Sequence, residues 1–291
     1  MTQLPWRRER REHYPGMPAW SLSTSRAALE EFHVSRQEEI TQQWAWGGSD
    51  GSGVRVCVLD TGVEGAHPRV GGLERSLVVS RDEDDRLTVT DCDPVDPAGH
   101  GTACAGIIRS LAPQVLLSSV RVLTDGKAGT GAALLAGLGW AIDQGYDLIN
   151  LSLSTTRSEF QPALHELADR AYFRRCLMVA SAHNMPVLSF PWTFSSVISV
   201  ASHDQADPMT YYYNPNPPAE FYGRGVRVPV AWPGGREIHS TGNSFAAPHI
   251  TGICALILSK HPWMTPFQLK SVLYLAANNV TSLNGGTHVR T

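Results

Sequence analysis

The sequence predicts an α/β fold in which a mostly parallel central sheet carries helices on both of its faces. Short, nearly continuous apolar runs alternate along the chain with longer segments that have helical spacing. Such apolar runs are typical of strands that are buried on both faces. The length of 291 residues, with 42% hydrophobic and 18% charged residues, suits a globular chain with a sizeable core.

The elements expected in the first half begin with a helix and a buried strand. Residues 27–46 have helical spacing, which the glycine-rich run 47–53 ends. Residues 53–60, "GVRVCVLD", are apolar at most positions and predict a strand. A short helix is expected over 100–111, and a second strand over 115–123. Between these elements the acidic tract 81–101 is expected to be a solvated loop, or alternatively an acidic rim that recruits basic substrate residues.

The second half repeats the alternation of helices and apolar runs. Helical spacing is found over 130–145 and 160–175, and the latter segment is amphipathic. Two helices are expected to close the chain, over 244–261 and 266–277. Four further apolar runs predict strands, at 147–153, 176–182, 196–202 and 226–232. The polar, arginine-rich residues 1–30 are expected to form an extension, and 31–291 one folded domain.

Composition excludes several classes of function. A net charge of −3 provides no general attraction to nucleic acid or to an anionic membrane, and the apolar runs are too short to span a bilayer. The first twenty residues contain arginines but no apolar run of the kind a secretory signal needs, so we expect a cytoplasmic protein. The five cysteines are scattered and lack CxxC spacing, so neither a disulfide framework nor a zinc site is expected. No other metal site and no cofactor are expected.

Four polar residues stand where the predicted elements begin or end. Asp60 and Asn184 follow buried strands, and functional groups of parallel sheets collect at the carboxyl ends of strands. His100 lies between two glycines at a helix start, and Ser244 begins a helix, where backbone N–H groups can receive an oxyanion. Each residue has a structural alternative. Asp60 can cap a turn before Gly62, His100 can be a structural residue, Asn184 can be a turn residue, and the small residues around Ser244 can open a tightly packed core helix.

The order of these residues is Asp, His, Asn, Ser. Asp before His before Ser is the subtilisin order, distinct from those of chymotrypsin and the α/β-hydrolases. The surrounding blocks "VCVLDTG", "HGTACAG", "INLSLS", "VASAHN", "FPWTFSSVISV" and "TGNSFAAPHITGICALILSKHP" resemble successive signature blocks of the subtilisin-like serine proteases, or subtilases. The resemblance extends from about Gln37 to about Ala277. It implies a three-layer subtilisin-like peptidase domain over 31–291 and a serine endopeptidase that acts on extended polypeptides.

The resemblance also implies a role for each of the four residues. Ser244 is the nucleophile, and His100 takes its proton and later gives it to the leaving amine. Asp60 holds the imidazole in the required tautomer. Asn184 occupies the oxyanion-hole position together with the backbone N–H of Ser244. His249, later in the serine block, is expected to be a packed helix histidine.

The same resemblance implies the walls of a substrate cleft. The backbone of Ser152, Leu153 and Ser154 is expected to pair with an extended peptide as an added β-strand. The opposite wall is expected to include Gly129 and Gly131.

The sequence departs from the usual family pattern at three points. His183 stands where most members have glycine, and it is expected to narrow or polarise the pocket that takes the side chain before the cleaved bond. Cys104, one turn after His100, resembles the cysteine of a thiol-containing branch of the family, although it can also be a small buried core residue. The segment 101–117 lacks the oxygen-rich calcium-binding insertion of many subtilases, so no dependence on tight calcium is expected.

Two alternatives to a general endopeptidase remain open. The chain can be a maturation protease for one peptide precursor, like short signal-less bacterial relatives, and the altered pocket at His183 suits such narrow specificity. It can also be a catalytically silent module that binds peptides in the same cleft, although all four chemical positions are filled. In each case the expected partner is a polypeptide, with no role for nucleic acid or membrane.

Overall fold

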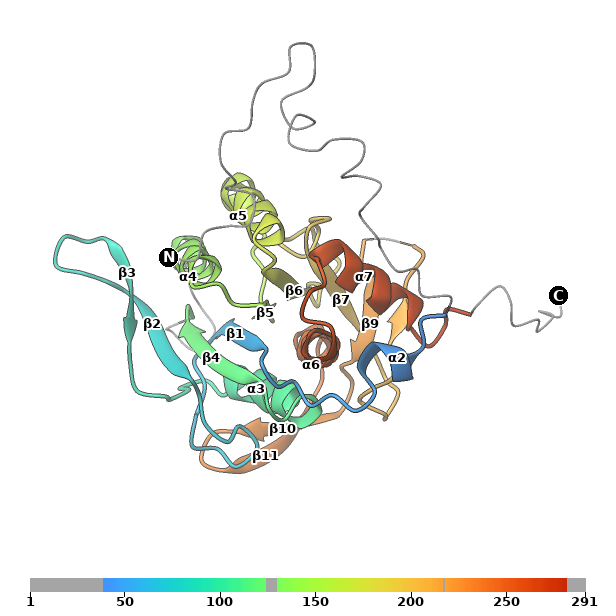
Figure 1. Ribbon diagram of the computed structural model, residues 1–291. Coiled ribbons are helices and arrows are strands. Elements are labelled where there is room, and N and C mark those ends of the chain that lie inside the picture. Colours follow the sequence, from blue (N-terminus) through green and yellow to red (C-terminus); the bar gives the residue numbers. More distant parts are fainter. Residues whose placement is uncertain (1–38, 124–129, 217, 282–291) are drawn as a thin grey trace, which may run out of the picture. The chain divides into compact units, whose positions relative to one another are not determined.

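The computed structural model describes residues 39–123, 130–216 and 218–281 (Figure 1). The chain divides into a unit of Met1–Glu39 and a unit of Ile40–Thr291, and the second unit contains all the described helices and strands. The predicted extension at 1–30 and the cleft residue Gly129 lie outside the described residues.

A nine-stranded sheet forms the centre of the domain, in the order β3-β2-β4-β1-β5-β6-β7-β9-β8. All adjacent pairs are parallel except β2–β3 and β8–β9 at the two edges. The mostly parallel α/β fold is therefore confirmed. The strands are β1 (Arg55–Asp60), β2 (Arg75–Arg81), β3 (Leu87–Asp91), β4 (Leu116–Arg121), β5 (Leu148–Leu151), β6 (Leu177–Ser181), β7 (Ile198–His203), β8 (Tyr212–Tyr213) and β9 (Phe221–Arg224).

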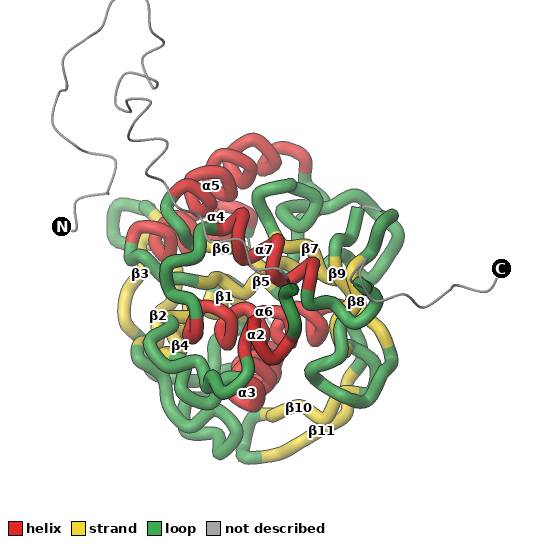
Figure 2. The backbone as a smooth tube through the Cα atoms, turned by 45° about the vertical axis from the view of Figure 1, so that its right-hand side comes forward, coloured by secondary structure: helices red, strands yellow, loops and turns green. Residues whose placement is uncertain are grey.

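Helices cover both faces of this sheet, as Figure 2 shows with α4 and α5 on one side of the strands and α3 and α6 on the other. The two faces explain why the strands are apolar almost throughout. In β1, Val56 and Val58 belong to the core under α3 and α6, whereas Cys57 and Leu59 belong to the core under α4 and α5. The helices are α2 (Gln42–Trp46), α3 (His100–Leu111), α4 (Gly131–Asp143), α5 (Gln161–Phe173), α6 (Asn243–Lys260) and α7 (Pro266–Leu275), with a 3₁₀ turn η2 at Ser158–Phe160.

The expected loop at 81–101 is wrong in its first part. Residues Leu87–Asp91 form β3, which pairs antiparallel with β2 as a hairpin at the sheet edge. Leu87 and Val89 alternate with polar residues because they pack against the core under α4, while the other face is solvated. The strand was not predicted because its alternation is short and acidic residues stand on both sides of it.

The strand expected at 226–232 forms, but it does not join the main sheet. It is β10 (Val228–Trp232), which pairs antiparallel with β11 (Arg236–Ser240) as a separate two-stranded sheet. Val228 and Val230 pack with residues of α3, such as Ile107, in a small apolar cluster. Periodicity predicts a strand but not the sheet that it joins.

Three further observations concern the segment after α3, the cysteines and the question of a membrane-spanning helix. The chain passes from the end of α3 at Leu111 to β4 at Leu116 through a short connection. All five cysteines are unpaired. Within the described residues, no helix is both long enough and apolar enough to cross a membrane.

Candidate active site

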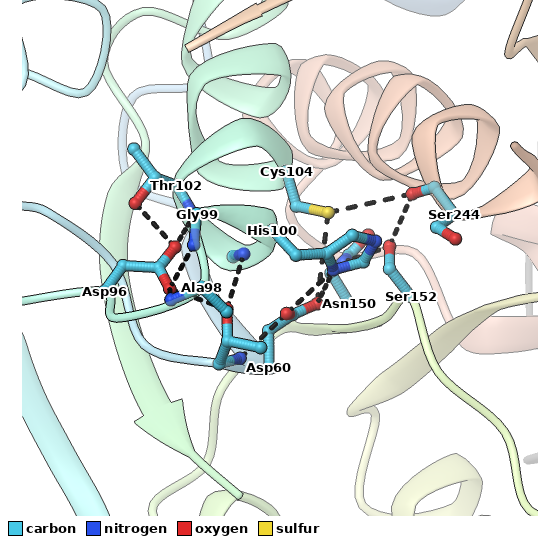
Figure 3. Close-up of polar contacts among 12 residues, drawn as sticks. Asp60, Asp96, Ala98, Gly99, His100, Thr102, Cys104, Asn150, Ser152 and Ser244 are labelled. Atoms are coloured by element: carbon cyan, nitrogen blue, oxygen red, sulfur yellow. Dashed lines mark hydrogen bonds and ion pairs between the residues drawn. The ribbon is translucent and has the colours of Figure 1, made fainter. Parts of the chain in front are cut away.

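The carboxyl end of β1 and the first turn of α3 bring Asp60 and His100 together. The Asp60 carboxylate is fully buried, and its two oxygens lie 2.8 and 2.9 Å from Nδ1 of His100 (Figure 3). Oδ1 of Asp60 also accepts a hydrogen bond from the backbone N–H of Thr61, at 2.7 Å. Because a carboxylate only accepts hydrogen bonds, Nδ1 of His100 carries the proton that it donates to Asp60.

Glycines on both sides of His100 allow this close approach. Gly99 has φ +88°, and a Cβ there would lie 2.7 Å from the Trp232 ring. A Cβ on Gly101 would lie 2.0 Å from the carbonyl oxygen of Gly62, next to Asp60. A larger residue at Gly101 would push the start of α3 away from the end of β1, and one at Gly99 would clash with Trp232 of β10.

Asp96, which sequence reasoning did not single out, holds the start of α3. Its Oδ2 accepts hydrogen bonds from the backbone N–H and the hydroxyl of Thr102, at 2.8 and 2.7 Å. Its Oδ1 accepts from the backbone N–H groups of Ala98 and Gly99 (Figure 3). The same oxygen accepts a hydrogen bond from the Thr61 hydroxyl. The signal that identifies it is an aspartate shortly before a predicted helix start, the usual place for a capping carboxylate.

Ser244 stands in the first turn of α6 and lines the same cavity as His100, a cleft of about 570 Å³. Its backbone carbonyl accepts a hydrogen bond from the Ser152 hydroxyl, at 2.7 Å (Figure 3). The amide of Asn150 donates in turn to that hydroxyl, at 3.1 Å. The start of α6 is thereby tied to the carboxyl end of β5.

Asn184 follows β6 and lies beside the start of α6. Its Oδ1 accepts a hydrogen bond of 2.9 Å from the backbone N–H of Asn243. Asn184 also lines the cleft that contains Ser244. With the carbonyl end of the side chain held in this way, the amide nitrogen Nδ2 is the group left to donate to a ligand.

The side chain of Asn243 links three segments, a role that sequence reasoning missed. Its Oδ1 accepts hydrogen bonds from the backbone N–H and the hydroxyl of Ser202 in β7, at 2.9 and 2.8 Å. Its Nδ2 donates to the carbonyl of His183, at 3.2 Å. No local pattern identifies this residue, because its partners are distant in sequence.

The other predicted cleft residues within the described chain all line the same cavity: Gly131, Ser152, Leu153, Ser154 and His183. A Cβ on Gly131 would lie 2.2 Å from the ring of Phe160, so that ring occupies the space where a side chain would point. Nδ1 of His183 accepts a hydrogen bond from the backbone N–H of Met185, at 3.0 Å. The neutral imidazole therefore carries its proton on Nε2.

Cys104 lies directly behind Asp60 and Ser244. Its buried Sγ is 4.0 Å from Oδ2 of Asp60 and 3.7 Å from the carbonyl oxygen of Ser244 (Figure 3). Burial, reinforced by the charge of Asp60, raises the pKa of the Cys104 thiol well above its usual value, so the group keeps its proton. The ligand atoms of Asp60, His100 and Cys104 lie within 4.8 Å of one another, and a soft metal ion that displaces the thiol proton would meet thiolate and imidazole ligands there.

Comparison with known proteins gives a consistent result. A sequence model of the subtilase family matches residues 51–289. Subtilisin DY of Bacillus licheniformis is 29% identical over 248 residues, which cover 80% of this chain and 86% of that protein. Thermitase of Thermoactinomyces vulgaris is 30% identical over 244 residues, covering 79% and 84% respectively. The crystal structure of a cold-adapted subtilisin-like serine proteinase superimposes with a TM-score of 0.64 at 27% identity, covering 82% of this chain and 88% of that chain.

Proposed function

The chain belongs to the subtilase family of subtilisin-like serine endopeptidases, and we propose that it hydrolyses peptide bonds through Asp60, His100 and Ser244. The single observation that carries this proposal is the Asp60–His100 pair, with Nδ1 of His100 at 2.8 and 2.9 Å from the carboxylate oxygens. Ser244 lines the cleft into which the same histidine opens.

The proton follows a simple route in this mechanism. Nε2 of His100 takes the proton of the Ser244 hydroxyl as its oxygen attacks the scissile carbonyl, and a tetrahedral oxyanion forms. Asp60 keeps its bond to Nδ1 and stabilises the imidazolium. His100 then protonates the leaving amine, and the C–N bond breaks to leave an acyl-enzyme. A water molecule, deprotonated by His100, hydrolyses this ester and restores Ser244.

Two donors are proposed for the oxyanion. One is Nδ2 of Asn184, whose opposite end is held by the backbone N–H of Asn243. The other is the backbone N–H of Ser244 in the first turn of α6, where amides have no partner within the helix and the helix dipole favours negative charge. Donors fixed before the reaction need no reorganisation when the charge develops.

The substrates of this family are polypeptides, and we propose that this chain binds them in an extended conformation along Ser152, Leu153 and Ser154. His183 lines the cleft with an Nε2–H donor where most family members have glycine, which supports a narrow specificity. That feature favours the second candidate function, maturation of one precursor peptide. Cleavage of a diverse peptide library distinguishes the two functions, because a maturation enzyme cuts a single sequence class and a general endopeptidase cuts many.

The position of Cys104 behind Asp60 and Ser244 supports membership of the thiol-containing branch of the family. We also propose the cytoplasm as the compartment of the protein. Five unpaired cysteines, four of them buried, suit a reducing environment.

A fluorophosphonate probe tests the proposed chemistry. The wild type is expected to be labelled, and Ser244→Ala to lose both labelling and proteolysis; in subtilisin the corresponding loss of kcat is about a millionfold. Ser240→Ala is the matched control, since Ser240 lines the same cleft and its loss is expected to leave labelling intact. A folded wild type that remains unlabelled and inactive on the library would support a silent peptide-binding module instead.

A further inference from the structure

A second cavity, of about 480 Å³, is lined by residues of α5, α7 and the strands at the β8 edge of the sheet. None of the described residues that line it lines the cleft containing Ser244. Phe173 and Phe267 expose 71% and 70% of their surface at this cavity. Single exposed aromatic residues are ordinary, whereas several around one hollow mark a contact surface. The aromatic residues that line the cavity are Tyr172, Phe173, Tyr213, Phe221, Phe267 and Tyr274.

Some of these rings stand at steep angles to one another. The ring centroids of Tyr213 and Tyr274 are 4.6 Å apart, with 71° between the ring planes. Those of Tyr213 and Phe221 are 5.9 Å apart, at 62°. The face of an aromatic ring carries partial negative charge, so rings that surround one hollow at steep angles attract a cation.

The charged residues of the cavity leave one carboxylate uncompensated. Nζ of Lys270 donates to Oε1 of Glu220 at 2.8 Å and to the backbone carbonyl of Ser195, also at 2.8 Å. Lys270 and Glu220 therefore neutralise each other. The carboxylate of Asp169, on α5, has no hydrogen bond or ion pair with any residue that the structure describes. The cavity thus combines aromatic walls with one unpaired negative charge.

A buried hydroxyl in the wall of this cavity is also without a partner. Ser196 lines the cavity and is only 9% exposed, and its Oγ makes no hydrogen bond within the described chain. A buried polar group that lacks a partner costs free energy, and a serine hydroxyl has lone pairs that can accept from a donor. Ser196 and Asp169 therefore leave acceptors for the N–H groups of a ligand.

We infer that this cavity binds an arginine side chain of a polypeptide partner. The guanidinium is planar and stacks on aromatic faces, and its five N–H donors can pair with both oxygens of Asp169 and still reach Ser196. The exposed rings of Phe173 and Phe267 extend the contact surface beyond one side chain, which suits apolar neighbours of that arginine in a polypeptide. This binding site goes beyond the proposed function, because it shares no described residue with the cleft.

A binding experiment tests the cavity without hydrolysis. The probes are two fluorescein-labelled twelve-residue peptides that differ at one central position, which is arginine in one and its uncharged analogue citrulline in the other. Leucines flank this position in both. Binding is measured by fluorescence anisotropy in a Ser244→Ala background. We expect the arginine peptide to bind about tenfold more tightly, since one charge-assisted hydrogen bond is sufficient for that ratio.

The isosteric variant Asp169→Asn is expected to abolish this preference, because it removes the charge and keeps the shape of the side chain. Tyr274→Leu is expected to weaken the arginine peptide more than the citrulline peptide, since it removes a ring face that attracts the cation. Glu166→Gln is the matched control, because Glu166 is an exposed carboxylate of α5 that does not line the cavity.

Retention of the arginine preference in Asp169→Asn, or its loss in Glu166→Gln, would overturn the inference. Sedimentation measures a second occupant. If Asp169→Asn dissociates a dimer and neither peptide binds the parent protein, the cavity belongs to an interface between two copies of this chain, and the inference is wrong.

A further measurement separates this inference from the proposed function. Hydrolysis of the p-nitrophenyl ester of a single acetylated amino acid requires the catalytic groups and does not involve the cavity. Asp169→Asn in an otherwise wild-type chain is expected to hydrolyse this ester at the wild-type rate, and a large loss would overturn the separation of cavity and cleft. Absence of ester hydrolysis in the wild type would refute the proposed chemistry, while the anisotropy result would still decide the cavity.

Discussion

The backbone N–H of Asn243 donates a hydrogen bond of 2.9 Å to Oδ1 of Asn184, so the residue before Ser244 determines which end of the Asn184 amide faces the cleft. The two segments come from distant parts of the sequence, one after β6 and one at the start of α6. The positions of both proposed oxyanion donors, Asn184 and the backbone N–H of Ser244, therefore depend on the hydrogen bond between Asn243 and Asn184.

Asn184→Ala is expected to lower kcat about a hundredfold to a thousandfold with little change in KM, the magnitude found for the corresponding residue of subtilisin. The reason is that the oxyanion exists only in the transition state, so the lost bond does not weaken substrate binding. Steady-state kinetics on a chromogenic peptide measure the two constants. A change confined to KM would assign Asn184 to substrate binding.

Asn243→Ala is expected to lower kcat about tenfold and to destabilise the fold by about 2 kcal/mol, because three hydrogen bonds of its side chain are lost. A double-mutant cycle with Ser202→Ala tests whether the loss of kcat comes from the hydrogen bonds between Asn243 and Ser202. If Asn243 acts through β7, the double variant is only slightly worse than Asn243→Ala alone. Additive losses, or an effect on the melting temperature without one on kcat, would remove Asn243 from the positioning of the site.

Mercurials are expected to inhibit the wild type, while Cys104→Ala resists them. A metal ion bound to Sγ of Cys104 would compete for the carboxylate of Asp60, 4.0 Å away, and displace the imidazole of His100. Cys57→Ala and Cys254→Ala serve as controls, because both thiols are also buried in the described chain. Undiminished sensitivity of Cys104→Ala would contradict membership of the thiol-containing branch.

The fold is expected to lose stability between pH 6.5 and 4 through His249. Burial lowers the pKa of this histidine from 6.5 to about 4, and the charges of Arg224 and His203 act in the same direction. Below pH 6.5 the histidine binds a proton in the unfolded chain but not in the folded chain. The free energy of unfolding therefore decreases as the pH is lowered from 6.5 to about 4. Over this pH range the shift in the pKa of His249 lowers the free energy of unfolding by on the order of 3 kcal/mol.

Thermal melts across this pH range test the effect, in a Ser244→Ala background that prevents self-digestion. His249→Gln retains a donor for the carbonyl of Phe245, to which Nδ1 of His249 donates at 2.7 Å, but it does not titrate. Its melting temperature is expected to fall less between pH 6.5 and 4 than that of the parent. Parallel curves for the two proteins would show that other groups govern acid stability.

The sequence alone predicted the features that depend on the residues of one short segment, such as the buried strands. Nearly continuous apolar runs predicted β1, β4, β5, β6 and β7, because strands buried on both faces need apolar residues at every position. The glycines around His100 indicated a close approach of backbones, and the expectation that His249 is a packed helix histidine is confirmed by its 3% exposure. The order of Asp60, His100, Asn184 and Ser244 identified the family, which the comparisons confirm.

Tertiary structure alone decided which residues hold these groups in place. Asn243 has no distinctive local pattern, and Asp96 has only its position shortly before a helix start. The importance of both residues comes from partners that folding brings near, such as Ser202 for Asn243 and Thr61 for Asp96. The hairpin of β2 and β3 was missed because its short alternation becomes meaningful only against α4. The sequence alone does not show whether the apolar residues Met185, Val187 and Leu188 are buried or exposed. Only the fold shows these side chains exposed beside the cleft, because burial is a property of contacts and not of composition.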